Sequence, residues 1–283
     1  MFLQVLYEGL IMGTIYALYA MGIALIWGVM NILSFSQGEF MMIAMYLTFF
    51  INAGLGWDPL AAMPIAIVVM FLFGVLIYRT IITKALKGPI LSQRLVTYAL
   101  GMILTNGMIL IAGGQTKSIA QKIFSGSFDF IGITISKEKL VLLCTSIVVT
   151  VLLFWFMNRT KMGKAIRATS QDKEAAGLVG INTQTAYTIA FAISTAIAGA
   201  AGSAMTYYYY FTPSIGANFM IFGFIAVCLG GFGSIGGAFV GGIIMGLVDL
   251  FAGTYLSVSY KYLAVSVIFL LIVTFKPKGL FGR

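Results

Sequence analysis

Long apolar stretches, separated by short polar or basic segments, dominate this sequence and restrict what it can fold into. A membrane-spanning helix needs about 20 consecutive, predominantly apolar residues. The 283 residues are 60% hydrophobic and only 9% charged, whereas soluble domains carry about 25% charged residues. A soluble chain of this composition would expose large apolar patches. The pattern therefore predicts an all-α, polytopic membrane bundle.

We expect about eight to ten transmembrane segments, which together form one transmembrane domain over residues 1–283. The second and seventh candidates are short and adjoin polar or glycine-rich breaks, so we interpret them as broken or re-entrant helices. Interrupted segments of this kind are typical of a transport site near the midplane of the membrane. The N-terminus lacks a basic region, so the first segment is interpreted as a membrane helix rather than a targeting signal. The candidate segments are 5–30, 37–52, 60–79, 94–113, 139–158, 184–210, 217–231, 237–253 and 260–275.

The distribution of charge predicts the orientation. The sequence contains 17 Lys and Arg but only 8 Asp and Glu. The basic residues are concentrated in short loops, as the positive-inside rule requires. The loops 79–94 and 159–174 and the tail with Lys276, Lys278 and Arg283 are therefore expected in the cytoplasm. The mixed loop 114–138 is expected outside, which leaves the C-terminus inside and, with nine segments, the N-terminus outside. Nucleic-acid binding is excluded as the reason for the basic charge.

This sequence contains few of the residues that catalysis or metal binding would need. There is no His, and the two Cys, Cys144 and Cys228, each lie inside an apolar run. A disulfide framework or zinc site is therefore not expected. The intramembrane acids Glu39 and Asp249 have no nucleophile or metal ligand near them in sequence, so we expect no catalytic residue in this chain.

A polar break follows the first segment and contains an ionisable group. An acid at membrane depth is costly unless it faces a cavity or a partner. The break therefore either lines a translocation pathway or is a hydrated surface loop with Glu39 at a helix N-terminus. A lone Asn in the fourth segment either lines the pathway or bonds between helices. The candidate pathway residues are Asn31, Ser34, Gln37, Gly38, Glu39 and Asn106.

The basic segment 159–183 has the sequence features of a folded element and not only those of a connecting loop. From Gly163 to Val179 the sequence predicts a short amphipathic helical pair, and Gly180 is a helix-ending residue. A positive-inside loop explains the lysines but not the cluster of small residues. A rigid knob of this kind suits contact with a soluble motor subunit.

A glycine-rich stretch near residue 233 permits tight turns and close helix packing, with a gating role as the alternative. Tyr207 to Tyr210, which follow the sixth segment, are interpreted as an interfacial aromatic belt, with contact to a docked binding protein as the alternative. The candidate packing glycines are Gly230, Gly231, Gly233, Gly236 and Gly237.

Four segments together resemble the permease family of branched-chain amino acid ATP-binding-cassette importers. The segment M-G-K-A-I-R-A-T-S-Q-D-K-E-A-A-G-L-V-G-I-N resembles its ATPase-coupling loop, and the start, through N-I-L-S-F-S-Q-G-E-F, resembles its first helix and polar break. The stretch L-G-G-F-G-S-I-G-G-A-F-V-G-G is similar to its glycine-rich hairpin, and P-K-G-L-F-G-R to its C-terminal signature. The resemblance extends over essentially the whole chain.

The resemblance implies a permease subunit in a bacterial or archaeal cytoplasmic membrane. It implies two partner ATPase subunits that bind ATP and Mg, so that this chain itself binds no cofactor, and indeed no G-x-x-x-x-G-K-[ST] sequence occurs. It also implies a second related permease subunit, different or identical, surrounding lipid, and an extracytoplasmic solute-binding protein. The residues it assigns to ATPase coupling are Gly163, Arg167, Asp172, Glu174, Ala175, Ala176, Gly180, Ile181 and Asn182.

One departure from the family pattern concerns the solute. Members commonly carry a lysine in the helix before the glycine-rich hairpin, whereas 219–229 carries no charge here. Branched-chain amino acids therefore stay open beside aromatic amino acids, urea, short amides and other small polar solutes. The alternative function is a stand-alone channel or an ion-coupled secondary transporter, which would need paired intramembrane acids or a proton relay.

Overall fold

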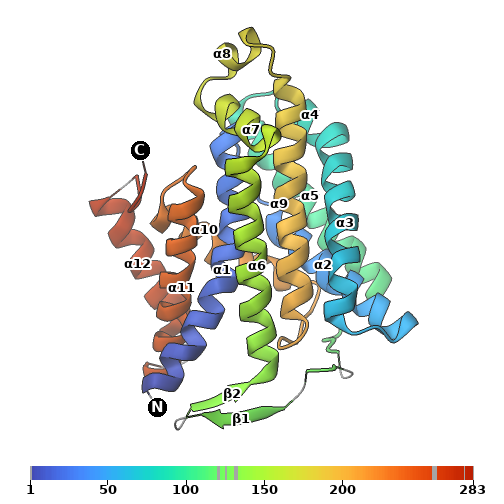
Figure 1. The fold of residues 1–283 in the computed structure, drawn as a ribbon, viewed down its shortest axis with the longest axis vertical. Helices are drawn as coiled ribbons and strands as arrows, with labels where there is room; N and C mark the ends of the chain where they lie inside the picture. The colour runs from blue at the N-terminus through green and yellow to red at the C-terminus, as the bar shows by residue number, and fades with distance from the viewer. Residues whose placement is uncertain are drawn as a thin grey trace.

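The structure is a computed structural model that describes residues 2–119, 122–124, 126–130, 133–256, 260–276 and 278–282. Arg283 of the predicted basic tail lies outside the described residues. Figure 1 shows an elongated helical bundle with a small hairpin at the end where the N-terminus lies. The helices are α1 (Phe2–Met30), α2 (Gln37–Leu55), α3 (Pro59–Ile77), η1 (Tyr78–Ile82), α4 (Thr83–Ala85), α5 (Ile90–Ala112), α6 (Lys137–Arg159), α7 (Lys161–Gln171), α8 (Lys173–Leu178), α9 (Thr183–Met205), α10 (Ile215–Gly230), α11 (Ile235–Tyr255) and α12 (Lys261–Phe275).

These helices confirm the predicted polytopic membrane bundle. Seven helices within the described residues are long and apolar enough to cross a membrane, where Pro59–Ala85 counts as one, and α10 and α12 are shorter apolar helices. Each of the nine predicted segments thus has a helical counterpart. The π-helical turn η1 lies inside the third of them, and its displaced Tyr78 carbonyl accepts a hydrogen bond from the Thr83 hydroxyl at 2.8 Å.

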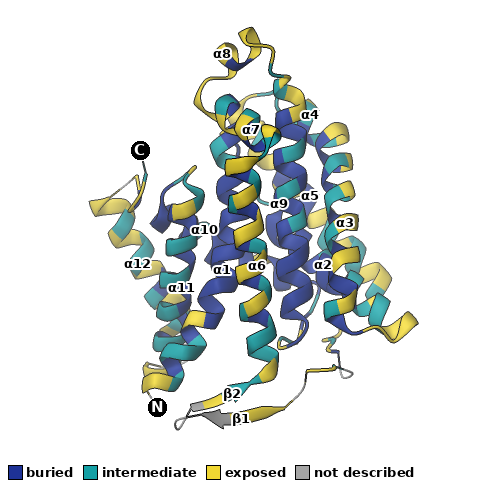
Figure 2. Cartoon of the chain, viewed as in Figure 1, coloured by how far each residue is buried: buried dark blue, intermediate teal, exposed yellow. Residues whose placement is uncertain are grey.

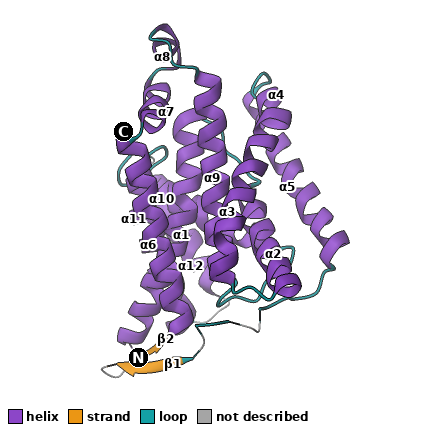
Figure 3. Ribbon diagram, turned by 45° about the vertical axis from the view of Figure 1, so that its right-hand side comes forward, coloured by secondary structure: helices purple, strands orange, loops and turns teal. Residues whose placement is uncertain are grey.

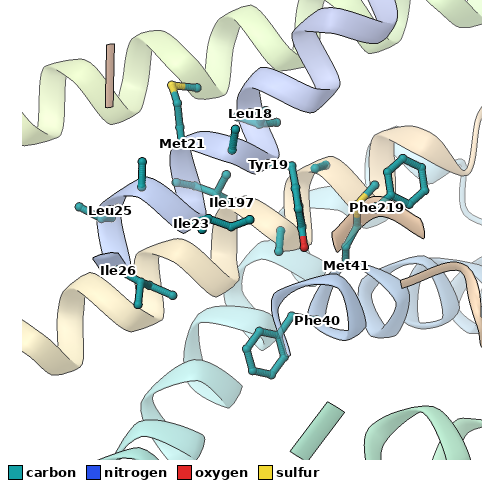
Figure 4. Close-up of a cluster of buried hydrophobic side chains, with 14 of the residues drawn as sticks. Leu18, Tyr19, Met21, Ile23, Leu25, Ile26, Phe40, Met41, Ile197 and Phe219 are labelled. Atoms are coloured by element: carbon teal, nitrogen blue, oxygen red, sulfur yellow. The ribbon is translucent and has the colours of Figure 1, made fainter. Parts of the chain in front are cut away.

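The core follows two central helices, α1 and α9, which Figure 2 shows as almost wholly buried. Their burial explains their composition, since α9 is rich in Ala and Gly, which allow neighbouring backbones to approach. A cluster of buried side chains joins α1 to α2, α9 and α10. Figure 4 shows Tyr19 of this cluster with its hydroxyl directed toward α2, near Phe40 and Met41.

The crossing of α1 and α11 brings two backbones into direct contact. Gly9 and Gly13 of α1 face Gly242 and Gly246 of α11, with a four-residue spacing on each helix. A Cβ atom added at Gly246 would lie 2.1 Å from the Gly13 nitrogen, and one added at Gly242 would lie 2.2 Å from the backbone of Ala17. This is the close approach that paired small residues permit in membranes.

Only the short strands β1 (Ser127–Phe130) and β2 (Ile133–Ser136) depart from the helical fold among the described residues. They pair antiparallel, with Ser127 opposite Ser136. The hairpin lies at the same end as Phe2, whereas α4, α7 and α8 lie at the opposite end (Figure 1). The loops predicted to be cytoplasmic therefore gather at one end, and the mixed loop 114–138 lies at the other.

The sixth segment ends earlier than predicted. Its helix stops at Met205 instead of residue 210, because the following residues make specific contacts. The Tyr207 hydroxyl donates a hydrogen bond to Asp58, and the backbones of Phe211 and Lys117 bond to each other. The predicted aromatic belt is therefore wrong for Tyr207, which is fully buried, although Tyr210 is exposed.

Helix α5 is set apart from the rest of the bundle, as Figure 3 shows. Only Thr97, Leu100 and Gly101 of this helix are buried within the chain. The opposite face is apolar and exposed, including Leu110 and Ile111. A helix with this pattern needs lipid or another protein chain to cover it.

Candidate translocation and coupling sites

The polar break between α1 and α2 folds back into the protein. Helix α1 ends at Met30, and the next residue, Asn31, has a φ of 54°, in the left-handed region that Asn tolerates better than most residues. Asn31 is exposed, but Ile32, Leu33 and Ser34 are buried. The prediction of a hydrated surface loop is therefore wrong for the residues after Asn31.

Helix α5 forms hydrogen bonds with the segment that connects α1 to α2. The Phe35 N–H donates to the Thr97 hydroxyl at 3.3 Å, and that hydroxyl donates to the Arg94 carbonyl of its own helix at 2.9 Å, with the Leu33 carbonyl 3.4 Å away. The Ser34 and Ser36 hydroxyls lie 3.2 Å apart, so each can satisfy the other. These bonds replace the water that a surface loop would use, which is what burial demands.

Gln37 starts α2 inside the bundle, where three helices meet. Its side-chain amide donates to the carbonyl of Ser194 at 3.0 Å and to the Ser194 hydroxyl at 2.8 Å. That hydroxyl in turn donates to the Gly22 carbonyl at 2.7 Å. The network fixes the first turn of α2 against α1 and α9, although the side-chain amide oxygen of Gln37, Oε1, has no partner among the described residues.

The starts of α2 and α10 abut in the middle of the bundle. A Cβ atom added at Gly38 would lie 2.0 Å from the Gly216 carbonyl oxygen, and one added at Gly216 would lie 2.9 Å from the Glu39 nitrogen. Only glycine allows this approach at either position. The second segment, predicted as a short broken helix, is long enough to span a membrane as the 19-residue α2, whereas α10 is a shorter apolar helix. The two helices meet at their N-termini, in a region that we call the junction (Gln37–Glu39 of α2 and Ile215–Asn218 of α10).

Glu39 lies at the junction and is 8% exposed. Its carboxylate lies against α5, because a Cβ atom added at Gly101 would be 3.2 Å from the carboxylate carbon. The Oε2 atom has no hydrogen-bond partner among the described residues. An acid buried in this way is costly, so its retention points to a function.

Asn106 does not join this group. It lies on the exposed side of α5, and its side chain donates to the Met102 carbonyl of the same helix at 2.7 Å. Bonding to another helix of this chain is therefore wrong, and the residue faces whatever covers α5.

The predicted helical pair exists as α7 and α8, at one end of the molecule (Figure 1). Thr160 caps α7 through the Gly163 N–H, and Asp172 caps α8 by accepting from the N–H groups of Glu174 and Ala175 at 2.8 and 3.0 Å. Asn182 caps α9 by accepting from the Thr185 N–H. Each cap satisfies N–H groups that a helix start leaves free, so the short helices are well defined.

The pair is anchored at one side and exposed at its tip. Gly163 packs against α6, since an added Cβ atom would lie 2.3 Å from the Phe156 carbonyl oxygen. Ile166 and Ala176 are buried, whereas Leu178 and Val179 are 89% and 76% exposed. Gly180 adopts a φ of 84° and ends the pair, as predicted. Glu174 and Ala175 are exposed, and Ile181 is partly buried at the return to α9.

A cavity of ≈ 510 Å³ separates α7 from the end of α1. Arg167 lines it and donates to the Asn158 side chain at 2.9 Å, and Asn31 lines it from the other side. The coupling pair and the polar break thus border one open space. No feature of the sequence predicted this cavity, because it lies between segments far apart in the chain.

Most of the predicted packing glycines make close contacts near the same end. Gly230 of α10 contacts Gly237 of α11, where an added Cβ atom would lie 2.1 Å from the Gly237 carbonyl oxygen. Gly231 has a φ of 105° and contacts the tail at Gly282, and Gly233 has a φ of 79°. An added side chain at Gly236 would meet nothing within 4 Å, so the packing prediction fails there.

The structure also supplies charged partners that the sequence left unassigned. Asp249 is 1% exposed, pairs with Lys261 at 2.8 Å and accepts from the Tyr16 hydroxyl at 3.0 Å. Glu8 pairs with Lys139 at 2.7 Å nearby. Asp249 thus takes part in an ion pair and a hydrogen bond, neither of which the sequence had identified. An apolar helix that carries one acid is the signal that such a partner exists.

Known proteins resemble this chain over its whole length. The family model described as "Branched-chain amino acid transport system / permease component" matches residues 5–274. The high-affinity branched-chain amino acid transport system permease protein LivH of Escherichia coli (strain K12) is 30% identical over 100% of this chain and 96% of its own. The corresponding permease protein BraD of Pseudomonas aeruginosa shows the same identity and coverage.

A solved structure shares the fold. PsaBC from Streptococcus pneumoniae, in complex with Fab, superposes with a TM-score of 0.52 and covers 97% of this chain and 92% of its own. The sequence identity of 17% limits this likeness to the fold. The family match over residues 5–274 and the relatives at 30% identity show that the chain belongs to the permease-component family of branched-chain amino acid transport systems and is a multi-pass membrane permease subunit.

Proposed function

We propose that this chain forms one half of the translocation unit of an ATP-binding-cassette importer for branched-chain or closely related amino acids. The names of the relatives support this solute class, because both LivH and BraD are branched-chain amino acid permease proteins. The uncharged stretch 219–229 leaves the choice among small amino acids and amides to the binding protein and to the junction. Hydrolysis takes place on the partners, so this chain is not itself an enzyme.

The observation that carries the proposal is the arrangement of α7 and α8. The pair is capped at each helix start, anchored on α6 through Gly163, and exposes an apolar tip at Leu178 and Val179. An exposed apolar tip on a rigid support is typical of an interaction surface. We assign this tip to a cleft of an ATPase subunit, where ATP and Mg bind.

The cavity behind α7 explains how a push on the tip reaches the pathway. Arg167 and Asn31 border the same space of ≈ 510 Å³, so α7 has room to move toward the end of α1. A displacement there acts on the segment that carries Gln37 and Glu39. Closing of this space would bring α7 against the end of α1, and two such arrangements of packed elements are the physical basis of a two-state gate.

The assembly follows from the surfaces left uncovered. The exposed apolar face of α5 is assigned to a second related permease subunit, either a different chain or a second copy of this one. The end that carries the hairpin is assigned to an extracytoplasmic binding protein. Lipid covers the remaining apolar surface.

The orientation is assigned from charge. The end with α4, α7, α8 and the basic tail faces the cytoplasm, as the positive-inside rule requires. The location is the cytoplasmic membrane of a bacterium or archaeon. Labelling of single cysteines at Lys87 and Phe124 of intact cells checks this, because only the Phe124 position should react with an impermeant reagent.

The coupling experiment uses Leu178→Glu in the complex of this chain with its partner permease and ATPases. We expect the complex to lose its ATPase subunits in detergent, or to hydrolyse ATP without stimulation by the loaded binding protein, because a charge replaces an apolar contact. Lys87→Glu, an exposed change at the same end of the molecule, is the matched control and should leave both properties intact. Normal assembly and stimulation in Leu178→Glu would contradict the proposal.

A further inference from the structure

We infer that the junction recognises the zwitterionic head of an α-amino acid during translocation, with Glu39 binding the ammonium group and the first turn of α10 binding the carboxylate. The inference rests on the proposed function, since it names how the solute is held on its route. It draws on groups within the described residues that have no partner in this chain.

The acceptor is the Glu39 carboxylate. Burial leaves it 8% exposed, and its Oε2 atom has no hydrogen-bond donor. Neither Lys nor Arg lies within ion-pair distance of it among the described residues, in contrast to Asp249, Glu8 and Glu138, which are paired. An unpaired buried carboxylate costs free energy that a bound ammonium group would recover.

The donors are the free N–H groups of the first turn of α10. A helix start leaves its first N–H groups without intrahelical partners, and the residue before α10, Ser214, makes no side-chain cap. The Ile215 N–H donates to the Thr212 carbonyl at 3.1 Å, so the candidate donors are the N–H groups of Gly216 and Ala217. Ala217 and Asn218 of this turn are exposed, so their backbone is open to a solute. The positive end of the helix dipole also favours a carboxylate there.

The two halves are adjacent because the junction forces them together. Gly38 and Gly216 allow the backbones of α2 and α10 to touch, which places the Glu39 backbone nitrogen 2.9 Å from an added Gly216 Cβ atom, while the Glu39 carboxylate lies on the side of α5, beside Gly101. The side-chain amide oxygen of Gln37, Oε1, is a second acceptor without a partner among the described residues. Helix starts that converge at membrane depth beside an acid match both charges of a zwitterion and match a neutral amide or urea poorly.

The same geometry argues against a purely structural role. Buried polar groups in this core differ in how far they are bonded, since Ser194 bonds to Gln37 and Gly22 whereas the hydroxyls of Tyr46 and Thr150 have no partner among the described residues. A carboxylate left without a partner costs more free energy than such a hydroxyl. Glu39 is bonded to none of the neighbouring side chains, although Gly101 leaves it room against α5. The acid therefore stabilises the closed core less than Gln or Met would.

The test measures leucine binding to the complete transporter in nanodiscs without its binding protein. Radiolabelled leucine is displaced by leucine, by leucinol, which keeps the ammonium group alone, and by 4-methylpentanoate, which keeps the carboxylate alone. We expect both analogues to compete about tenfold more weakly than leucine, because each lacks one charged hydrogen-bonding group.

Two variants separate the two halves of the site. Glu39→Gln should weaken leucine and leucinol about tenfold and leave 4-methylpentanoate unchanged. Ala217→Pro, which removes a first-turn N–H that has no intrahelical partner, should weaken leucine and 4-methylpentanoate and leave leucinol unchanged. Glu138→Gln, which removes a similar charge from the outer end, is the control and should change none of them.

The outcomes distinguish this inference from the proposed function. ATPase stimulation by the loaded binding protein, measured on each variant, reports whether the transporter is assembled and folded. If Glu39→Gln is stimulated normally and still binds leucine and leucinol as tightly as the wild type, the inference is wrong while the importer stands. If the wild-type complex neither assembles nor imports leucine, the proposed function fails first.

Discussion

The crossing of α1 and α11 makes a quantitative prediction about Gly246. An added Cβ atom would lie 2.1 Å from the Gly13 nitrogen, whereas ordinary contact begins at 3.4 Å, so the two backbones must separate by about 1.3 Å, the difference of these distances. Forcing an extra methyl group into a packed core costs about 1–3 kcal/mol. Gly246→Ala should therefore destabilise the protein, although Ala favours a helix by about 1 kcal/mol over Gly.

A control on the same helix removes the propensity term. Gly253 also lies in α11, but an added Cβ atom there meets nothing within 4 Å. Gly253→Ala gains the same helix propensity without a clash, so the difference between the two variants isolates the packing cost of about 1–3 kcal/mol. Unfolding in mixed micelles with increasing dodecyl sulfate gives both free energies. Equal unfolding midpoints for the two variants would refute the close approach of α1 and α11.

Three further predictions concern other contacts. Asp249→Asn should lower the free energy of unfolding by about 3 kcal/mol because it leaves Lys261 without its partner, and a double variant with Lys261→Met should recover most of the loss in the same micelle titration. Burial and the neighbouring Asp58 raise the pKa of Tyr207, so its hydrogen bond should persist below about pH 10 and be lost only as the pH rises through the raised pKa. The difference in phenolate absorbance between the wild type and Tyr207→Phe measures the titration of this hydroxyl. Titration at the ordinary tyrosine pKa would contradict the prediction. Gly163→Val should push α7 off α6, because an added Cβ atom would lie 2.3 Å from a backbone oxygen, and should reduce stimulated ATP hydrolysis while membrane insertion stays normal.

Local signals account for what the sequence predicted well. Hydropathy runs predicted the helices, because each span must satisfy its own backbone in lipid. The α7–α8 pair was predicted from small residues and from Gly180, whose φ of 84° is a local requirement. The end of α9 was predicted five residues too late, since Tyr207 to Tyr210 are apolar enough to continue a helix and only the distant Asp58 turns Tyr207 inward.

The candidate site depended on contacts that no local pattern encodes. Glu39 and Gln37 were predicted as polar residues at a break, but whether they face water or protein depends on Thr97 and Ser194. Asn106 looked equivalent in sequence, and its place on the exposed side of α5 separates it from them. Side-chain chemistry can be listed from a sequence, whereas its partners come from the packing of distant helices.

The junction combines two features that each lower the stability of the bundle. A continuous helix would satisfy its own N–H groups, whereas α2 and α10 begin inside the bundle and leave theirs to be satisfied by other groups. Gly38 and Gly216 add to the cost, because glycine weakens a helix and here excludes any larger side chain. Sites that violate the rules of stable packing are expected to be functional. The unpaired Glu39 and the two glycines violate them at one point, the junction where we infer that the solute is held.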